Sequence, residues 1–214
     1  KILSCFLSNV TTILYEEVYI MENMIVLSSE KELKVLMSPI RQRIIRQMSR
    51  EGKPVTSKYI ADKLNISPSS AQHHIKQLQE IGIIEFDHSE VINGITARYL
   101  KLSEKNISIG TNINDDLNLE RDVLAKNMLF ETYTDYQNVI NSMRSVITED
   151  YYKENRVLDF VTGAIHLSQE DANKLFNIID EFIKKHSKAS DNTHPFEFAL
   201  IAYRADLETN NEGK

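Results

Sequence analysis

The chain has 214 residues, of which 42% are hydrophobic and 26% charged, an ordinary globular composition with room for one substantial domain or two small ones. A single cysteine, Cys5, excludes an intrachain disulfide and a thiolate metal cluster, and it fits a reducing compartment. No apolar run approaches the roughly 20 residues that a membrane span needs, so we expect a cytoplasmic protein without a membrane partner.

The net charge of −6 conceals an uneven distribution. Residues 30–105 hold 13 Lys and Arg against 9 Asp and Glu, whereas the rest of the chain holds 12 against 22. A basic segment attached to an acidic one is the pattern expected of a nucleic-acid-binding domain joined to a second module.

Residues 1–27 give no clear element. Their apolar stretch is interrupted by Ser4, Ser8 and Asn9, which argues against a signal peptide. Two interpretations stay open: the natural start lies at Met21 or Met24, or residues 12–20 form an extra element that covers a dimer surface. We leave this segment unassigned and place the first domain at residues 28–104.

Two helices are predicted at the start of that domain. Ser29 and Glu32 have the spacing of a capping box, and Ser38 before Pro39 pairs an N-cap with a first-turn proline. Gly52 is expected to end the second helix. That helix also carries four arginines, which either position phosphates or solvate its surface: Arg41, Arg43, Arg46 and Arg50.

Two further short helices follow, separated by a tight turn. The first covers residues 56–65, with Thr56 or Ser57 as N-cap and Asn65 as a left-handed C-terminal residue. The second begins at Ser67 and runs to residue 81, and its buried face is expected to contain Ala71, Ile75 and Leu78. This arrangement is a helix-turn-helix, whose second helix enters the DNA major groove. The alternative is a surface helix pair in an ordinary helical domain.

A β-hairpin is predicted directly after these helices. Residues 83–88 and 95–103 are strand-like, and Asn93-Gly94 between them is a hairpin-turn signal. Lys53-Pro54-Val55 is expected to add a third strand. A helix-turn-helix followed by a hairpin is a winged helix, and Arg98 and Lys101 on the second strand suit DNA phosphates. A solvated edge strand would carry the same charges.

These motifs together resemble the winged helix-turn-helix of the ArsR-like (arsenic-repressor-type) transcription regulators, over about 75 residues. The matching positions, in the family's order, are Pro39, Arg41, Ile60, Ala61, Leu64, Ile66, Ser67, His74, Ile75, Leu78, Gly82, Ile83 and Ile84. The resemblance implies a homodimer that binds a roughly palindromic double-stranded DNA operator. It implies base contacts by Ser69, Ser70, Gln72 and His73, and we expect phosphate or wing contacts by Lys76, Gln77, Arg98 and Lys101.

The chain departs from the metal-sensing members of that family. Cys5 lies outside the matched region, and the six histidines show no ligand spacing, so we expect no metal and no cofactor. His74 lies beside the apolar stripe of its helix, and we interpret it as a packed, hydrogen-bonded structural residue.

A polar, Asn-rich stretch at residues 105–114 is the predicted linker to a C-terminal domain at 115–206, which we expect to mediate dimerisation and to bind an effector if there is one. A long helix is predicted over residues 115–147. Its seam of Tyr136, Ile140, Met143 and Ile147 has a 4, 3, 4 spacing that suits a partner helix of a second subunit, or packing within one chain. The tyrosines could line an effector pocket or be packing residues: Tyr133, Tyr136, Tyr151 and Tyr152.

The last third is predicted to be a strand-helix-strand module. Residues 156–167 and 195–205 are strand-like, and an amphipathic helix at 168–186 would cover them with its apolar face of Ala172, Leu175, Phe176, Ile179, Phe182 and Ile183. Residues 207–214 form a tail. The fold class is therefore α+β: a winged helix-turn-helix, a long dimerisation helix and this module.

No set of catalytic residues is recognisable, since the chain lacks a phosphate-binding glycine loop, a nucleophile elbow and an H-E-x-x-H motif. The sequence thus predicts a homodimeric, sequence-specific DNA-binding transcription regulator rather than an enzyme. The rival interpretations are a winged helix that binds another protein and one that binds structured RNA.

Overall fold

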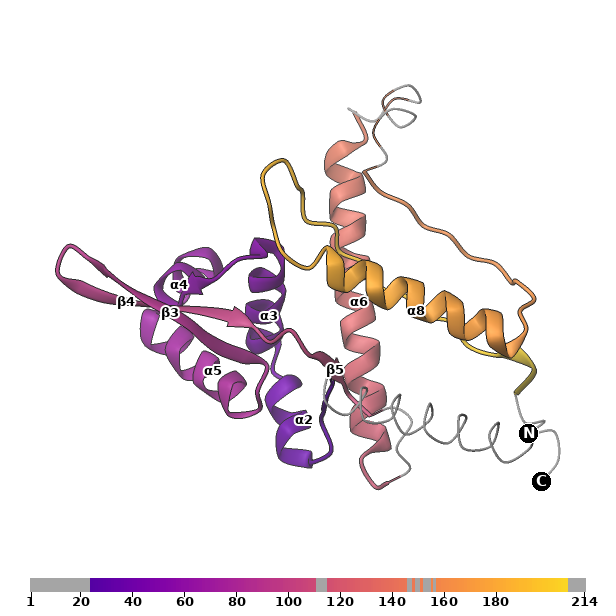
Figure 1. Cartoon of the computed structure of the whole chain (residues 1–214), viewed down its shortest axis with the longest axis horizontal. Helices are drawn as coiled ribbons and strands as arrows, with labels where there is room; N and C mark the ends of the chain where they lie inside the picture. The colour runs from indigo at the N-terminus through magenta and orange to yellow at the C-terminus, as the bar shows by residue number, and fades with distance from the viewer. Residues whose placement is uncertain are drawn as a thin grey trace, which may run out of the picture. The chain divides into compact units, whose positions relative to one another are not determined.

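The computed structural model describes residues 24–110, 115–145, 148, 151, 155 and 157–207. These fall in two compact units, one within residues 1–127 and 160–195 and the other within 128–159 and 196–214. The winged helix lies in the first unit (Figure 1). No helix in the described part of the chain is long and apolar enough to cross a membrane.

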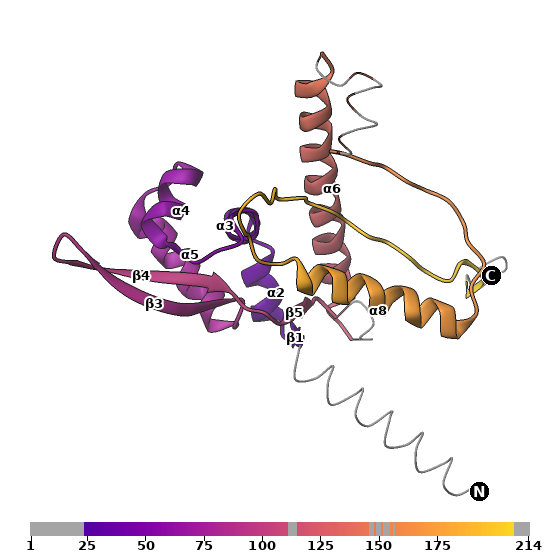
Figure 2. The same ribbon diagram turned by 45° about the horizontal axis from the view of Figure 1, so that its top comes forward.

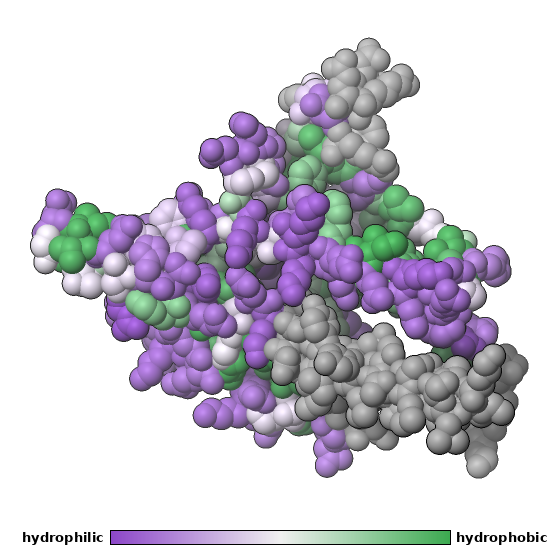
Figure 3. All heavy atoms as spheres, in the orientation of Figure 1, coloured by the Kyte–Doolittle hydropathy of each residue, from purple (hydrophilic) through white to green (hydrophobic). Residues whose placement is uncertain are grey.

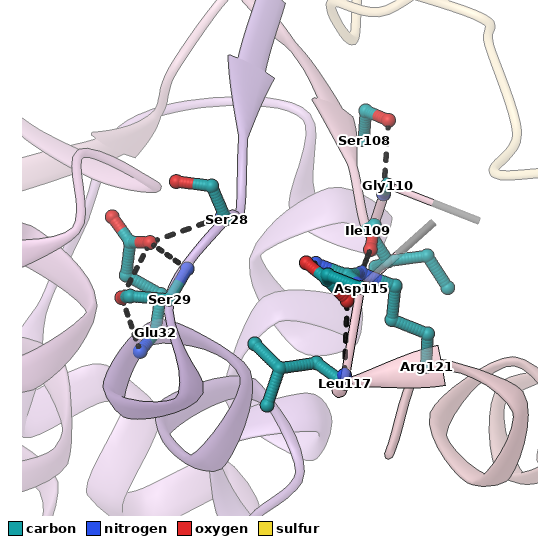
Figure 4. A network of polar contacts seen from close by, with 9 residues as sticks. All are labelled: Ser28, Ser29, Glu32, Ser108, Ile109, Gly110, Asp115, Leu117 and Arg121. Atoms are coloured by element: carbon teal, nitrogen blue, oxygen red, sulfur yellow. Dashed lines mark hydrogen bonds and ion pairs between the residues drawn. The ribbon is translucent and has the colours of Figure 1, made fainter. Parts of the chain in front are cut away.

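Helices α2 (Glu30–Leu36) and α3 (Pro39–Glu51) open the domain as predicted. Ser29 and Glu32 form the capping box: the Glu32 amide donates to Ser29 Oγ, and the Ser29 amide donates to the Glu32 carboxylate at 2.9 Å (Figure 4). Hydrogen bonds from Ser29 lower the pKa of Glu32. Ser38 differs from the prediction because its side chain makes no cap bond; Pro39 alone marks that helix start. Gly52 ends α3 at φ 60°.

Helices α4 (Ser57–Leu64) and α5 (Pro68–Glu80) form the predicted helix-turn-helix. Thr56 caps α4 by accepting the Tyr59 amide at 3.1 Å, and Ser67 caps α5 by accepting the Ser70 amide at 3.2 Å. Asn65 has the left-handed conformation, with φ 53°, which few other side chains tolerate and which reverses the chain between the helices.

A three-stranded antiparallel sheet completes the domain, in the order β2 (Val55–Thr56), β4 (Ile95–Leu102) and β3 (Ile84–Ile92). Asn93 and Gly94 join β3 to β4 with φ values of 50° and 77°, as a two-residue hairpin turn requires. A bulge between Phe86 and His88 shifts the register of β3. The β3–β4 hairpin extends past α4 and α5 in both ribbon views (Figure 2), which confirms the predicted wing. The predicted third strand is also present, at Val55–Thr56 instead of residues 53–55.

One core supports this domain. The four helices α2 to α5 contribute Leu33, Ile44, Ile60 and Leu78 to one cluster, all 0% exposed, and strands β2 and β4 contribute Val55 and Leu100. The three buried residues expected in α5 are confirmed as Ala71, Ile75 and Leu78. Burial of such a face, rather than helix propensity, fixes the position of a short helix.

Two short strands lie just outside the predicted limits of 28 and 104. Strand β1 (Met24–Val26) pairs in parallel with β5 (Asn106–Ser108), and Leu27 is fully buried and donates its amide to the Ser108 carbonyl at 2.9 Å. The predicted linker at 105–114 is therefore partly a strand, and the unassigned segment contains another. Residues 1–23 and 111–114 lie outside the described residues.

The long helix α6 (Asn118–Met143) begins at a buried ion pair. Arg121 is only 1% exposed, and its guanidinium binds both carboxylate oxygens of Asp115 while Nε donates to the Ile109 carbonyl at 2.9 Å (Figure 4). The Arg121 guanidinium lowers the pKa of Asp115. Because a buried guanidinium needs such partners, this contact fixes the start of α6 against the segment after β5.

The C-terminal region shows the predicted helix without the predicted strands. Helix α8 (Gln169–Lys185) begins at Ser168, whose Oγ accepts the Asp171 amide at 3.1 Å. In the described parts of residues 156–167 and 195–205, only the short 3₁₀ helix η1 (Ala205–Leu207) is regular, and the remainder is extended but unpaired. A strand needs a neighbour for its backbone hydrogen bonds, and a local apolar pattern cannot supply one. Residues 208–214 lie outside the described residues.

Candidate nucleic-acid interface

The outer face of α5 is polar and exposed. Ser69, Gln72 and His73 are exposed, as is Lys76, whereas Ser70 is half-buried. The opposite face holds the buried residues Ala71, Ile75 and Leu78. Hydroxyl, amide and imidazole groups on the N-terminal half of an exposed helix can donate to and accept from base edges. The structure thus brings the four predicted base-contacting residues together on one open surface.

The first of these groups also takes part in the helix cap. Ser69 Oγ lies 3.1 Å from Ser67 Oγ, which accepts the Ser70 amide. This contact fixes the position of the Ser69 hydroxyl at the beginning of α5. The Ser69 hydroxyl can still form a further hydrogen bond to a ligand, since a hydroxyl has one donor and two acceptor sites.

Arg41 has an internal role that the sequence did not reveal. Its guanidinium donates to the Gln77 side-chain oxygen on α5, to the Val35 carbonyl, and to the Lys34 carbonyl at 3.0 Å. The arginine therefore links the C-terminal end of α2 to the last turn of α5. These contacts disfavour Arg41 as a phosphate contact, and they leave the NH₂ group of Gln77 as the donor that it can offer to a phosphate. Arg43 likewise donates to the Leu64 carbonyl, at 3.4 Å.

His74 faces this arginine, in agreement with its interpretation as a structural residue. It is half-buried, and its Nδ1 lies 3.5 Å from Arg41 Nη1. Burial, followed by the positive charges of Arg41 and His73, lowers the pKa of His74 below its ordinary 6.5. The neutral ring is therefore the form that the folded domain accommodates.

The domain should consequently lose stability in mildly acidic solution. Because the pKa of His74 is lower in the folded state, the unfolded chain binds more protons just below pH 6.5, so the free energy of unfolding falls as the pH drops through this region. His74→Gln should reduce that fall, and His194→Gln, a change in an exposed segment, should leave it intact. Urea unfolding at pH 5 to 8 would measure it, and identical profiles for wild type and His74→Gln would contradict the assignment.

The wing carries the two predicted phosphate contacts in different settings. Arg98 is exposed, with its guanidinium over the Phe86 ring at 5.2 Å. Lys101 is half-buried and lies 3.4 Å from Asp87 at the bulge. Hydrogen bonds from His88 and Lys101 lower the pKa of that carboxyl. The charge of Lys101 is thus partly neutralised within the wing, whereas Arg98 forms no ion pair with an acidic side chain of the described residues.

The tip of the wing is apolar, a feature that the charges of Arg98 and Lys101 did not predict. Val91 and Ile95 are each 74% exposed and Ile92 is 46% exposed. They form the hydrophobic patch at the far end of the hairpin in Figure 3. The turn signal at Asn93-Gly94 could have located this patch, because residues beside a hairpin turn have few neighbours to cover them.

The predicted dimer seam on α6 is only partly open. Tyr136, Ile140 and Met143 are half-buried, and Ile147 lies outside the described residues. A different row is more exposed: Leu119, Val123 and Phe130, at 72%, 38% and 70%. Their spacing of 4 and 7 places them on one side of the helix, away from the buried Leu124. The helical period alone could have identified this row.

No group of three or more His, Cys, Asp or Glu side chains in the described residues could hold a metal ion. Of the tyrosines that could line an effector pocket or serve as packing residues, Tyr133 and Tyr136 have ring centroids 6.2 Å apart, and Tyr152 lies outside the described residues.

Comparison with known proteins identifies the domain. Residues 36–85 match the family model described as "Helix-turn-helix domain". This match covers both helices of the motif, the helix before them and the start of the wing, and it confirms that this segment is a helix-turn-helix domain. No curated protein is similar enough to the chain to be matched.

Among solved structures, the chain is similar to three regulators at low identity. The adhesin competence repressor AdcR from Streptococcus pyogenes is 15% identical, with 83% of this chain and 96% of that chain covered and a TM-score of 0.32. The heme sensor PefR from Streptococcus agalactiae is 15% identical over 85% and 92%, with a TM-score of 0.29. A variant of ZitR from Lactococcus lactis is 17% identical over 83% and 97%, with a TM-score of 0.31. At these values the similarity carries no argument about ligand or mechanism.

Proposed function

Because residues 36–85 match a helix-turn-helix domain and fold with the hairpin as a winged helix, we propose that this chain is a homodimeric transcription regulator of the ArsR-like type that binds a specific double-stranded DNA operator. The observation that carries the proposal is the open polar face of α5, with Ser69, Gln72 and His73 exposed opposite a buried apolar face. A helix held in this way can enter a major groove without losing its own core contacts.

In this proposal the parts of the domain have distinct tasks. Ser69, Ser70, Gln72 and His73 read base edges, and Lys76, Gln77, Arg98 and Lys101 contact phosphates. The phosphate contacts supply affinity for any sequence by releasing counterions, while the base contacts supply discrimination. The surplus of basic side chains over acidic ones in residues 30–105 supports the sequence-independent affinity for phosphates.

Dimerisation is assigned to α6, through Tyr136, Ile140, Met143 and Ile147 together with the exposed row of Leu119, Val123 and Phe130. A soluble monomer rarely leaves such a row uncovered. Two copies related by a two-fold axis would present two α5 helices to successive major grooves, about 34 Å apart. We also assign the C-terminal region as the place where a small-molecule effector of unknown class would act.

Selection from a random library of duplexes tests the function. Full-length protein should enrich an inverted repeat whose half-sites lie about 10 base pairs apart, centre to centre. Binding of the selected duplex, of a shuffled duplex and of a hairpin RNA is then compared by fluorescence anisotropy at two salt concentrations. Failure to enrich any repeat would favour a protein-interaction module, and preferential binding of the RNA would favour RNA recognition.

Lys76→Ala should weaken binding to operator and shuffled DNA equally. Its ammonium is exposed on the groove-facing side of α5, so its loss removes a phosphate contact that carries no sequence information. The slope of log K against log salt should fall by about 1. Lys31→Ala, which removes an exposed lysine on α2, is the control. A loss confined to operator DNA would instead make Lys76 a base contact.

A further inference from the structure

Helix α8 has an apolar stripe that no described part of the chain buries. None of its residues is fully buried: Ala172, Leu175 and Ile179 are half-buried, and Phe182 is 65% exposed. Beside them, Phe176 and Ile178 are 42% and 64% exposed. Its apolar positions Ala172, Leu175, Ile179 and Phe182 follow a 3, 4, 3 spacing. This spacing is the one by which two helices interlock along a seam.

The stripe is symmetric about its own centre. Counted from residue 177, Leu175 and Ile179 lie two residues to either side, and Ala172 and Phe182 lie five to either side. Two copies of α8 laid antiparallel therefore place Ala172 against Phe182 and Leu175 against Ile179, so that a small side chain meets a large one at both ends. A parallel pair would place phenylalanine against phenylalanine and alanine against alanine.

The charges are symmetric about residue 178, one position from the centre of the stripe. The first turn of α8 carries Glu170 and Asp171, and the last turn carries Lys184 and Lys185. This distribution suits the dipole of the helix itself, and it also makes the two ends of one copy complementary to the opposite ends of another. The row beside the stripe contains Asp171, Ile178 and Lys185, spaced by seven. In an antiparallel pair Asp171 lies next to the partner's Lys185, and Ile178 meets its own copy at the centre.

We propose that α8 pairs antiparallel with α8 of a second copy of this chain, through Ala172, Leu175, Ile179 and Phe182. The inference rests on the proposed homodimer and names a contact within it. The pair is isologous, since each contact between residues i and j occurs twice across the two-fold axis. We assign a second copy of the chain as the partner of this stripe, because two antiparallel copies match small side chains with large ones and acidic ends with basic ends.

Cysteine cross-linking tests the orientation. Cys5 is first replaced by Ser, since it is the only cysteine of the chain. Asp171→Cys and Lys185→Cys are then introduced in separate full-length proteins, which are oxidised singly and as a mixture. The mixture should give a disulfide-linked dimer on a non-reducing gel, and each protein alone should give little, because only antiparallel pairing brings position 171 near the partner's 185.

Two results would overturn the proposal. Cross-linking of each variant with itself would show a parallel pair. A dimer by sedimentation with no cross-link in the mixture would mean that the stripe is covered otherwise, for example by residues 157–167 or 195–204 of its own chain.

A charge-reversal pair serves as the second measurement. Lys185→Asp should raise the dimer dissociation constant roughly 3- to 10-fold, because each of two symmetric exposed pairs becomes repulsive, and Asp171→Lys in the same chain should restore it. Failure of the double variant to restore dimerisation would count against the pairing. Operator binding is measured separately and tests the proposed function. Sequence-specific binding without the cross-link would contradict only the α8 contact. A cross-link without sequence-specific binding would contradict only the proposed operator binding.

Discussion

Replacing Leu78 by Ala should lower the free energy of unfolding of the winged helix by about 2 to 5 kcal/mol. Leu78 is 0% exposed and belongs to the cluster that holds α5 against α2, α3 and the sheet. Removing three buried carbon atoms there loses their transfer free energy and leaves a cavity that a close-packed core fills only partly. Urea unfolding followed by circular dichroism measures the change.

Two substitutions sharpen this expectation. Leu78→Met conserves volume and should cost less than about 1.5 kcal/mol. Ser69→Ala on the exposed face of the same helix should stay within about 0.5 kcal/mol, as is usual for a surface site. A cost below about 1 kcal/mol for Leu78→Ala would mean that α5 does not depend on this core for its position.

Gln72→Ala and His73→Ala should each weaken binding to the selected operator roughly 5- to 150-fold, which corresponds to about 1 to 3 kcal/mol for a good base contact. Both side chains are exposed on the outer face of α5, and neither is buried in the domain, so their removal should leave folding intact. Affinity for shuffled DNA should change little, because base contacts contribute only to discrimination.

His194→Ala, in an exposed segment outside the winged helix, is the matched control for the histidine. Binding isotherms on both duplexes at one salt concentration give the ratio of specific to non-specific affinity. An equal loss on both duplexes would assign Gln72 and His73 to phosphate contacts, and unchanged affinity for both duplexes in both variants would remove α5 as the reading helix.

The parts of the fold that the sequence predicted are those fixed by chemistry between near neighbours. Thr56, Ser67 and Ser168 each accept a backbone amide within three residues, and Asn65 and Gly94 adopt the left-handed conformation that their side chains permit. The buried face of α5 follows from a helical period of 3.6 residues. These signals need no knowledge of the rest of the chain.

Other features depend on partners far along the chain. Strands β1 and β5 are three residues each and pair across about 80 positions, so neither has a local pattern long enough to identify it. Arg41 seemed as suited to DNA as the other arginines of α3, yet it lies where a guanidinium can reach both α2 carbonyls and Gln77 on α5. The candidate base contacts could be named from the sequence because the helix start and the period fix which side faces outward.

The parallel pairing of Met24–Val26 with Asn106–Ser108 places the chain's entry into the winged helix beside its exit from it. The start of the long helix is tied to the same domain, because Arg121 donates to the Ile109 carbonyl directly after the exit strand and Leu124 lies in the domain core. We therefore expect the winged helix and the first turns of α6 to move as one body. In a dimer held together by α6, the position of this helix would set the spacing of the two reading helices.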